Sequence, residues 1–276
     1  MIKKQKTIKN PITVAGIGIH TGENIRADFY PAECNSGIIF KRTDIKGSPG
    51  IKAEYKNVIN SKREVTLMKE NIEVHTVEHL LATLSAFGIT NLLVEVNGPE
   101  LPIGDGSAVH FIEKFKEADV YVQEEEQKVL VCTHPIYIRD GEKYLIALPS
   151  DEFKINYTVD YAQPIGTQFA SYCINEEVFI QNIARARTFG FLHEVKELWA
   201  NNLAQGGSLE NAVVIGKNNI LNGDLRYPDE LVRHKIMDLL GDLYLIGMPI
   251  LADIIAVKSG HCLNIKLVEK LSQCIS

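Results

Sequence analysis

The sequence predicts an α+β protein made of two units of similar plan. Its 276 residues exceed the usual size of one compact core, and each half shows strand-like runs followed by helical patterns. Between the halves, residues 121–128 read YVQEEEQK, an acidic stretch that looks exposed. We therefore predict an N-terminal unit over residues 1–124 and a C-terminal unit over residues 125–276, with the boundary near Glu125.

The first unit begins with β-branched runs between residues 7 and 56. The runs ITVAG, NIRADF and GIIFKR are separated by Gly, Pro and Asn, which favours strands of an antiparallel sheet. Over residues 76–87, apolar side chains recur at helical spacing, with the first threonine as the expected N-cap and Gly88 as the stop. A strand over 91–96 and a helix over 107–118 complete this unit.

The second unit repeats the order of strands and then helices. VLVCTHPIYI, KYLIALP and FKINYTVDY are typical of strands, and helical patterns follow over residues 176–185, 195–201 and 231–246. The run LADIIAVK predicts one more strand. A last helix is expected after His261.

Composition and charge exclude several classes of protein. Apolar residues make up 45% and charged residues 23% of the chain, a balance typical of soluble globular proteins. The net charge of -6 comes from 29 basic and 35 acidic residues that are mixed along the chain, so no basic stripe is present to bind nucleic acid. We expect no nucleic-acid partner.

The cysteines and the N-terminus favour the cytoplasm. The five cysteines are odd in number and form no C-x-x-C pair, which argues against a disulfide framework. The basic start MIKKQKTIKNPITVAG lacks the long apolar run of a signal peptide. Since no window reaches the roughly 20 apolar residues that span a bilayer, we expect at most peripheral membrane contact. The sequence does not decide the oligomeric state, and a monomer is the expectation.

A polar stripe on the predicted helix over 231–246 is the strongest local signal for chemistry. Residues four apart are neighbours on a helix, so His234, Asp238 and Asp242 line up. A solvated face is the ordinary explanation of such a stripe. Here Leu231 and Leu245 lie on the same side, so the helix is apolar nearly all round. Buried carboxylates beside a histidine need a partner, and a metal ion is the strongest one.

A catalytic zinc ion needs three protein ligands and an open position, so a third ligand must come from elsewhere. The candidate is His79, next to Glu78 in the first turn of the earlier helix. There the helix dipole favours a neutral imidazole and an ionised carboxylate. The alternative is that both residues simply match the dipole of the helix N-terminus.

Three further motifs are ambiguous by themselves. Lys258-Ser259-Gly260-His261 precedes the last helix, where a histidine is usually a cap or a surface residue. ARARTFG over residues 184–190 is equally a helix C-terminus with favourable cations. GIGIHTG over residues 16–22 lacks the βαβ context of a phosphate loop, so we interpret it as a tight turn that brings His20 near a site.

Taken together, these motifs resemble the UDP-3-O-acyl-N-acetylglucosamine deacetylase family, in the family order and over nearly the whole chain. The matching segments are GxGxHTG (16–22), TVEHLL (76–81), EVNGPELPIGDGSA (95–108), ARARTFGF (184–191), GGSLENAVV (206–214), LRYPDELVRHKIMDLLGDLYLIG (225–247) and KSGHCLNIKL (258–267). The resemblance implies a two-domain α/β sandwich in which each domain has a mostly antiparallel sheet packed with helices. The active site would lie between the domains.

The resemblance also assigns a metal site and its acid-base groups. The zinc ligands would be His79, His234 and Asp238. Glu78 would be the general base, and His261 the general acid or electrostatic partner. Ferrous iron is an alternative ion for two histidines and one aspartate.

Other roles follow from the same resemblance. Thr188 would donate to the oxyanion, and Asp242 would orient His261. Lys235 and Lys258 would contact the substrate, and Phe189 would pack on its sugar ring. A small-molecule UDP-sugar lipid is the implied substrate.

The implied reaction removes acetate from the nitrogen of UDP-3-O-[(R)-3-hydroxyacyl]-N-acetylglucosamine, the committed step of lipid A biosynthesis in Gram-negative bacteria. An apolar channel for the acyl chain is expected between about Phe191 and Val214, although the apolar residues there could equally form ordinary core. Two rival functions stay open at this point. One is a zinc amidase or esterase with another substrate, and the other is a binding module around a structural metal ion.

Overall fold

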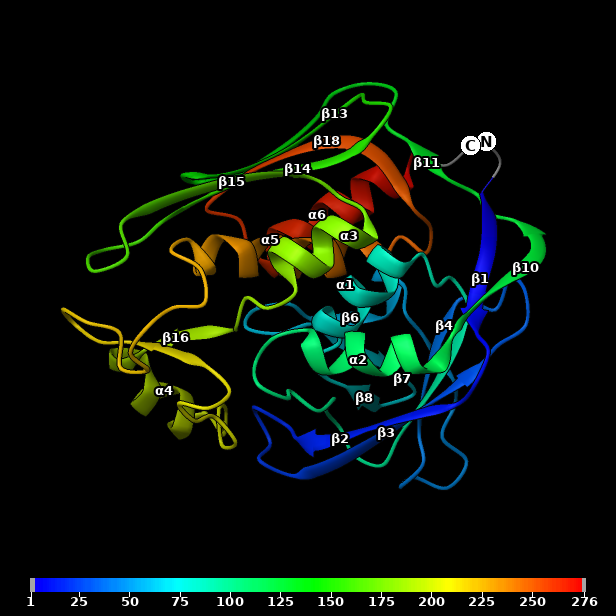
Figure 1. Cartoon of the computed structure of the whole chain (residues 1–276), viewed down its shortest axis with the longest axis horizontal. Coiled ribbons are helices and arrows are strands. Elements are labelled where there is room, and N and C mark those ends of the chain that lie inside the picture. Colours follow the sequence, from blue (N-terminus) through cyan, green and yellow to red (C-terminus); the bar gives the residue numbers. More distant parts are fainter. Residues whose placement is uncertain (1–2, 275–276) are drawn as a thin grey trace.

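In the computed structural model, which describes residues 3–274, two sheets enclose a layer of helices (Figure 1). The sheet of the N-terminal half has the strand order β2-β3-β9-β4-β5. Its strands are β2 (Ile12–Ile17), β3 (Asn24–Pro31), β9 (Leu92–Val96), β4 (Ile38–Arg42) and β5 (Ile51–Lys52).

The sheet of the C-terminal half has the order β12-β13-β18-β14-β15, and a short strand, β11, pairs with β18. Its strands are β11 (Leu130–Val131), β12 (Ile136–Asp140), β13 (Lys143–Leu148), β14 (Phe153–Asp160), β15 (Thr167–Cys173) and β18 (Ile250–Val257). The run VLVCTHPIYI, predicted as one strand, is thus two strands, because Pro135 lies in the gap and has no N–H for a ladder.

Both sheets are mostly antiparallel, and the predicted α+β class is confirmed. The exceptions are the parallel pairs β4 with β9, β14 with β18, and β11 with β18. In β18 the burial alternates strictly, so Ala252, Ile254 and Ala256 lie in the core. This alternation is the period of a strand with one face on the helices.

The helices between the sheets come from both halves of the chain (Figure 1). They are α1 (Glu78–Phe87), α2 (Val109–Ala118), α5 (Glu230–Tyr244) and α6 (His261–Ser272). Helix α1 packs on α5 at Gly241, where a Cβ atom would overlap the carbonyl oxygen of Glu78. The missing side chain lets the two backbones approach closely.

The first helix ends as predicted but begins differently. Gly88 caps α1 in the left-handed region at φ 69°. At the other end the N-cap is Val77, and the expected cap, Thr76, is itself left-handed at φ 57°. The Thr76 hydroxyl contacts the carboxylates of Glu64 and Glu100 and makes no cap.

The predicted helix over 176–185 is a short α3 (Glu176–Val178) that continues as a π-helical turn, η2 (Phe179–Ile183).

The acidic stretch over 121–128 is largely strand β10 (Val120–Glu126), which pairs with β1 (Lys4–Ile8). One apolar cluster runs through both halves of the described chain. The division at Glu125 therefore stays a prediction.

Two smaller units flank the helical layer. In the first, β16 (Phe189–Phe191) pairs in parallel with β17 (Val213–Ile215), and the connection carries the turn η3 (Leu192–Glu194) and α4 (Val195–Ala200). We call residues 189–215 the insert, and Figure 1 shows it beside the main body. In the second, the turn η1 (Tyr55–Asn57) leads into strands β6 (Val58–Asn60), β7 (Thr66–Lys69) and β8 (Ile72–Val74).

Candidate functional site

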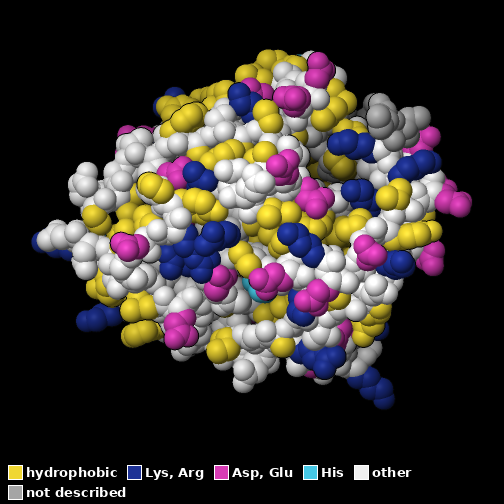
Figure 2. Space-filling view, in the orientation of Figure 1, with side chains coloured by type: hydrophobic (Ala, Val, Ile, Leu, Met, Phe, Trp, Pro, Cys, Tyr) yellow, Lys and Arg dark blue, Asp and Glu magenta, His cyan; other side chains and the backbone are white. Residues whose placement is uncertain are grey.

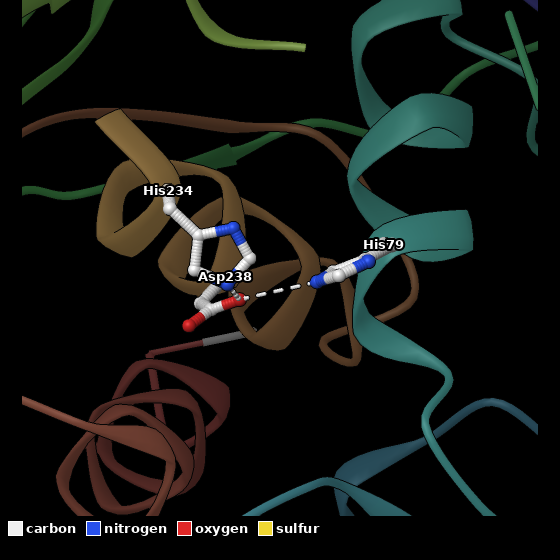
Figure 3. Close-up of side chains that lie close together, drawn as sticks. All are labelled: His79, His234 and Asp238. Carbon is white, nitrogen blue, oxygen red and sulfur yellow. Dashed lines mark ion pairs between the residues drawn. The ribbon is translucent and has the colours of Figure 1, made fainter. Parts of the chain in front are cut away.

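Helices α1 and α5 bring the three predicted metal ligands together (Figure 3). His79 comes from the first turn of α1, and His234 and Asp238 lie one turn apart on α5. The Oδ1 atom of Asp238 is 3.3 Å from Nε2 of His234 and 3.7 Å from Nε2 of His79. The two rings meet edge to face, with centroids 5.1 Å apart.

This group fits a divalent metal ion. Its three donor atoms lie within 4.8 Å of one another, and all three side chains are buried. Two imidazole nitrogens and one carboxylate oxygen are a donor set that zinc prefers, and three ligands leave a position open. His234 has Nδ1 3.3 Å from the carbonyl oxygen of Ala186. Donation from Nδ1 would leave the Nε2 lone pair free to bind a metal.

Burial and charge keep two of the proposed ligands, His234 and Asp238, in the states that bind metal. Burial lowers the pKa of His234 to about 4, so its imidazole is neutral near pH 7. Burial alone would raise the pKa of Asp238, but its neighbours His234 and Lys235 lower it well below its usual range. The Lys235 ammonium donates to Oδ2 of Asp238 at 2.6 Å. An ionised carboxylate beside neutral imidazoles is what metal binding requires.

Glu78 lies one residue before the ligand His79 and is also buried. Its Oε2 atom accepts a hydrogen bond of 3.2 Å from the backbone N–H of Val65. Burial raises the pKa of Glu78 to about 7, against the opposing attraction of His261 and His79. A carboxylate with this pKa can both take up and release a proton at neutral pH.

His261 begins α6 and forms a buried pair with Asp242. Their Nδ1 and Oδ2 atoms are 2.8 Å apart, and Asn264 donates a second hydrogen bond of 2.8 Å to the same oxygen. Burial opposes the imidazolium charge, but the attraction of Asp242 outweighs it and raises the pKa of His261 to about 9. The other ring nitrogen lies 3.8 Å from Asp238, so this pair adjoins the group of His79, His234 and Asp238.

Two predicted residues lie where the insert begins. The Phe189 ring has its centroid 5.8 Å from that of His234 and 5.7 Å from that of Tyr161. The backbone of Thr188 is held between two segments, since its N–H donates to Gly106 and its carbonyl accepts from Val213. Both residues therefore lie on a backbone that is tied to the main body.

Lys258 pairs with carboxylates outside the group of His79, His234 and Asp238. Its ammonium lies 2.7 Å from Asp160 and 3.3 Å from Glu142, and the side chain is about one-third exposed. It occupies the turn before His261 in a left-handed conformation at φ 53°. The turn therefore places Lys258 at the rim and His261 inside.

Sequence reasoning did not find a second group of possible metal ligands, made of the half-buried His20 and the buried Glu64 and Glu100. The predicted tight turn does bring His20 beside charged groups, because its Nε2 atom lies 3.6 Å from Glu64. Glu64 gave no signal, since it lies in a connection without helical or strand periodicity, and Glu100 lies in the family motif over 95–108 but received no role of its own. Asn264, the second partner of Asp242, was missed because a polar residue in α6 is unremarkable in sequence.

The predicted metal and acid-base residues lie inside the molecule. Histidine contributes almost nothing to the face drawn in Figure 2, where acidic, basic and apolar side chains are interspersed. His79, His234 and His261 are each less than a tenth exposed. Across residues 3–274 we find no helix whose length and apolar character would let it cross a bilayer.

A buried His-His-Asp group, flanked by a carboxylate with a pKa near neutrality and by a charged imidazole, is typical of metal-dependent hydrolases. Within that class, the family model of the UDP-3-O-acyl N-acetylglycosamine deacetylases matches residues 5–273. The chain belongs to this family, as its motifs predicted.

Curated relatives agree over nearly their whole length. A UDP-3-O-acyl-N-acetylglucosamine deacetylase of Syntrophotalea carbinolica is 45% identical over 97% of this chain and 87% of its own. Proteins of the same name from Citrifermentans bemidjiense and Bdellovibrio bacteriovorus are 44% and 41% identical over 97% of this chain, covering 88% and 89% of their own lengths. The family assignment therefore includes both halves of the fold.

Proposed function

We propose that this protein is a metal-dependent deacetylase that hydrolyses the acetamide of UDP-3-O-[(R)-3-hydroxyacyl]-N-acetylglucosamine. Its relatives carry the name of this reaction, and the chain shares their family over residues 5–273. The observation that carries the proposal is the convergence of Glu78 and the His261–Asp242 pair on the group His79, His234 and Asp238. The reaction would take place in the cytoplasm, as the committed step of lipid A biosynthesis.

The metal would be held by His79, His234 and Asp238. Zinc suits this donor set, and ferrous iron is the alternative. When bound, such an ion would polarise the acetamide carbonyl and lower the pKa of a coordinated water.

Glu78 and His261 divide the proton transfers between them. Glu78 accepts a proton from the attacking water, whose oxygen forms the new bond to the acetamide carbon. His261, whose pKa is raised to about 9, is mostly protonated at neutral pH and donates to the departing nitrogen. The C–N bond then breaks, and acetate and the free amine leave. An unprotonated amine is a poor leaving group, so a charged imidazole matters at this step.

The other predicted residues hold the substrate and the developing charge. Thr188 donates a hydrogen bond from its hydroxyl to the tetrahedral oxyanion. Hydrogen bonds of this kind make a large contribution to the rate of acyl transfer. Phe189, beside the ring of His234, packs on the sugar. Lys235 and Lys258 supply positive charge, one next to Asp238 inside the site and the other at its rim.

The insert is the proposed binding region for the fatty acyl chain. Phe189 and Phe191 form an aromatic cluster with Tyr161, with centroids between 5.3 and 6.4 Å apart. Farther along, Leu192 and Trp199 are about half exposed, so this part of the insert is not ordinary core. An apolar strip that begins next to His234 would guide an acyl chain away from the reacting amide.

Deacetylation of the UDP-linked substrate by purified protein tests this function. We expect activity that is lost on chelation and restored by zinc or ferrous iron. The activity of a His234→Ala variant should not return with metal. Turnover of a simple amide or ester but not of the UDP-linked substrate would instead favour the amidase or esterase alternative. Bound metal without any turnover would favour a binding module.

A further inference from the structure

A second cluster of buried charged side chains lies beside the start of α1, and the proposed mechanism gives it no role. Glu64 and Glu100 are almost completely buried. Nδ1 of His75 lies 2.9 Å from Glu64 on one side, and Nε2 of His20 lies 3.6 Å from it on the other. Two carboxylates so close together need donors, and the surrounding protein provides them.

The donors are protein groups, which makes a second cation an inferior explanation for this cluster. Glu100 accepts from the backbone N–H groups of His20 and Thr21 at 2.9 Å and from the Thr21 hydroxyl at 2.8 Å. Nδ1 of His20 accepts from the N–H of Ala204 at 3.3 Å, so the ring proton is on Nε2. A protonated Nε2 faces Glu64 as a donor and has no lone pair for a metal.

At the centre of the cluster is a strained residue, Thr76. It is buried, β-branched and left-handed at φ 57°, a combination that side chains of this shape rarely adopt. Its hydroxyl lies 2.9 Å from an oxygen of Glu64 and 3.0 Å from an oxygen of Glu100. The backbone of His75 is held as well, because its N–H donates to Pro99 and its carbonyl accepts from Leu101. Strain of this kind persists only where the surroundings enforce it.

The strained residue is directly connected to the proposed general base. Thr76 lies two residues before Glu78, so its conformation sets the direction in which α1 begins. Val65, which follows Glu64 in the chain, donates its N–H to the Glu78 carboxylate at 3.2 Å. The Glu64 carboxylate thus holds the Thr76 hydroxyl, and the peptide N–H that follows Glu64, that of Val65, holds the Glu78 carboxylate.

We propose that Glu64, Thr76 and Glu100 are positioning residues, which hold the Glu78 carboxylate in the orientation needed for proton transfer. The inference rests on the proposed function, because it gives Glu78 the role of the base. None of the three residues needs to touch the substrate. Their loss should therefore lower kcat while KM and metal content stay close to those of the wild type.

Thr76→Val tests this, since valine keeps the shape of threonine and removes only the hydroxyl. We expect kcat to fall about tenfold to a hundredfold, the scale expected for a small misplacement of a reacting group. Thr76→Ser, which keeps the hydroxyl, should recover most of the activity. The matched control is Thr90→Val, because Thr90 bonds to Lys6 at a distance from this cluster.

A crystal structure of Thr76→Val provides a readout that needs no substrate. We expect the contact between Val65 and Glu78 to be lost in it and kept in Thr76→Ser. If the wild-type protein leaves the UDP-linked substrate unchanged, only the proposed function is refuted. The structures of Thr76→Val and Thr76→Ser would still decide whether Thr76 positions Glu78. If Thr76→Val does not fold, Glu64→Gln takes its place. Wild-type kcat and an unmoved Glu78 in the tested variant would overturn the inference.

Discussion

Glu78 and His79 are adjacent in sequence and have different roles in the proposed reaction. Successive residues of a helix point about 100° apart, so one of them can face a metal ion directly while the other lies beside it. Glu78→Gln should therefore keep the metal and lose roughly two to four orders of magnitude in turnover, the usual scale for a lost general base. Metal analysis together with kcat checks this. A variant without metal would make Glu78 a ligand.

The pair of His261 and Asp242 predicts a pH dependence. The pKa of His261 is raised to about 9, so the protonated acid is present at neutral pH and is lost as the pH rises through that value. Asp242→Asn removes the attraction that raises this pKa. The alkaline limb of the kcat profile should then move to lower pH, which kinetics from pH 6 to 10 would show.

The same pair should behave as a unit in a double-mutant cycle. Once His261→Ala has removed the acid, Asp242→Ala should reduce turnover little further, with a coupling of about 0.5 to 3 kcal/mol. Asp242→Ala also removes the hydrogen bond from Asn264. This loss occurs whether or not His261 is present, so it cancels in the coupling energy. Simply additive effects, with weaker metal binding in the Asp242 variant, would show that Asp242 only supports the metal helix.

At the scale of elements, the approach of α1 to α5 determines the distance between the ligands. Alanine is a better helix former than glycine by about 1 kcal/mol. At Gly241, however, the new Cβ would overlap the carbonyl oxygen of Glu78, and such overpacking typically costs about 1 to 3 kcal/mol. Gly241→Ala should therefore lower the free energy of unfolding and weaken metal binding. Chemical denaturation and metal titration measure the two effects.

Gly190 provides the control for that substitution. It lies in β16, and a Cβ atom there would meet no heavy atom within 4 Å. Gly190→Ala should therefore leave the free energy of unfolding nearly unchanged. Equal losses in both variants would mean that the contact between α1 and α5 has no special importance.

At the scale of the whole molecule, the proposed metal site joins the two halves of the chain. His79 comes from the first half and His234 from the second, so an ion bound by both should stabilise the complete fold. At a metal concentration about 100 times the Kd, the expected gain is about 2.7 kcal/mol. Thermal unfolding with zinc and after chelation would show it as a higher Tm, with one ion per chain. His79→Ala should show little of this gain.

The insert gives the whole molecule a second expected property, selectivity for the acyl chain. Each methylene buried in an apolar channel contributes about 0.8 kcal/mol, or roughly fourfold in affinity. Substrates with progressively shorter acyl chains should therefore lose kcat/KM steeply. Equal kcat/KM for acylated and deacylated substrates would rule out a channel in the insert.

Local patterns were enough to predict much of this protein. Helical patterns identified α1 and α5, and Gly88 marked the end of α1, because helix geometry depends on neighbours within a few residues. The stripe of His234, Asp238 and Asp242 was readable for the same reason. The family motifs extended this to both sheets and to the pairing of His79 with α5.

Other features depend on contacts between distant parts of the chain, which local patterns do not contain. Thr76 looked like a helix cap, but two carboxylates 12 residues before it and 24 residues after it hold it in a left-handed conformation. The acidic stretch over 121–128 looked exposed in sequence, yet most of it pairs with β1 at the other end of the N-terminal half. Burial raises the pKa of Glu78, whereas for His261 the attraction of Asp242, 19 residues earlier in the chain, outweighs burial and raises the pKa. Residue propensities describe which secondary structure a segment favours in isolation. Contacts with residues far away in sequence decide backbone strain, strand pairing and the charge of buried side chains.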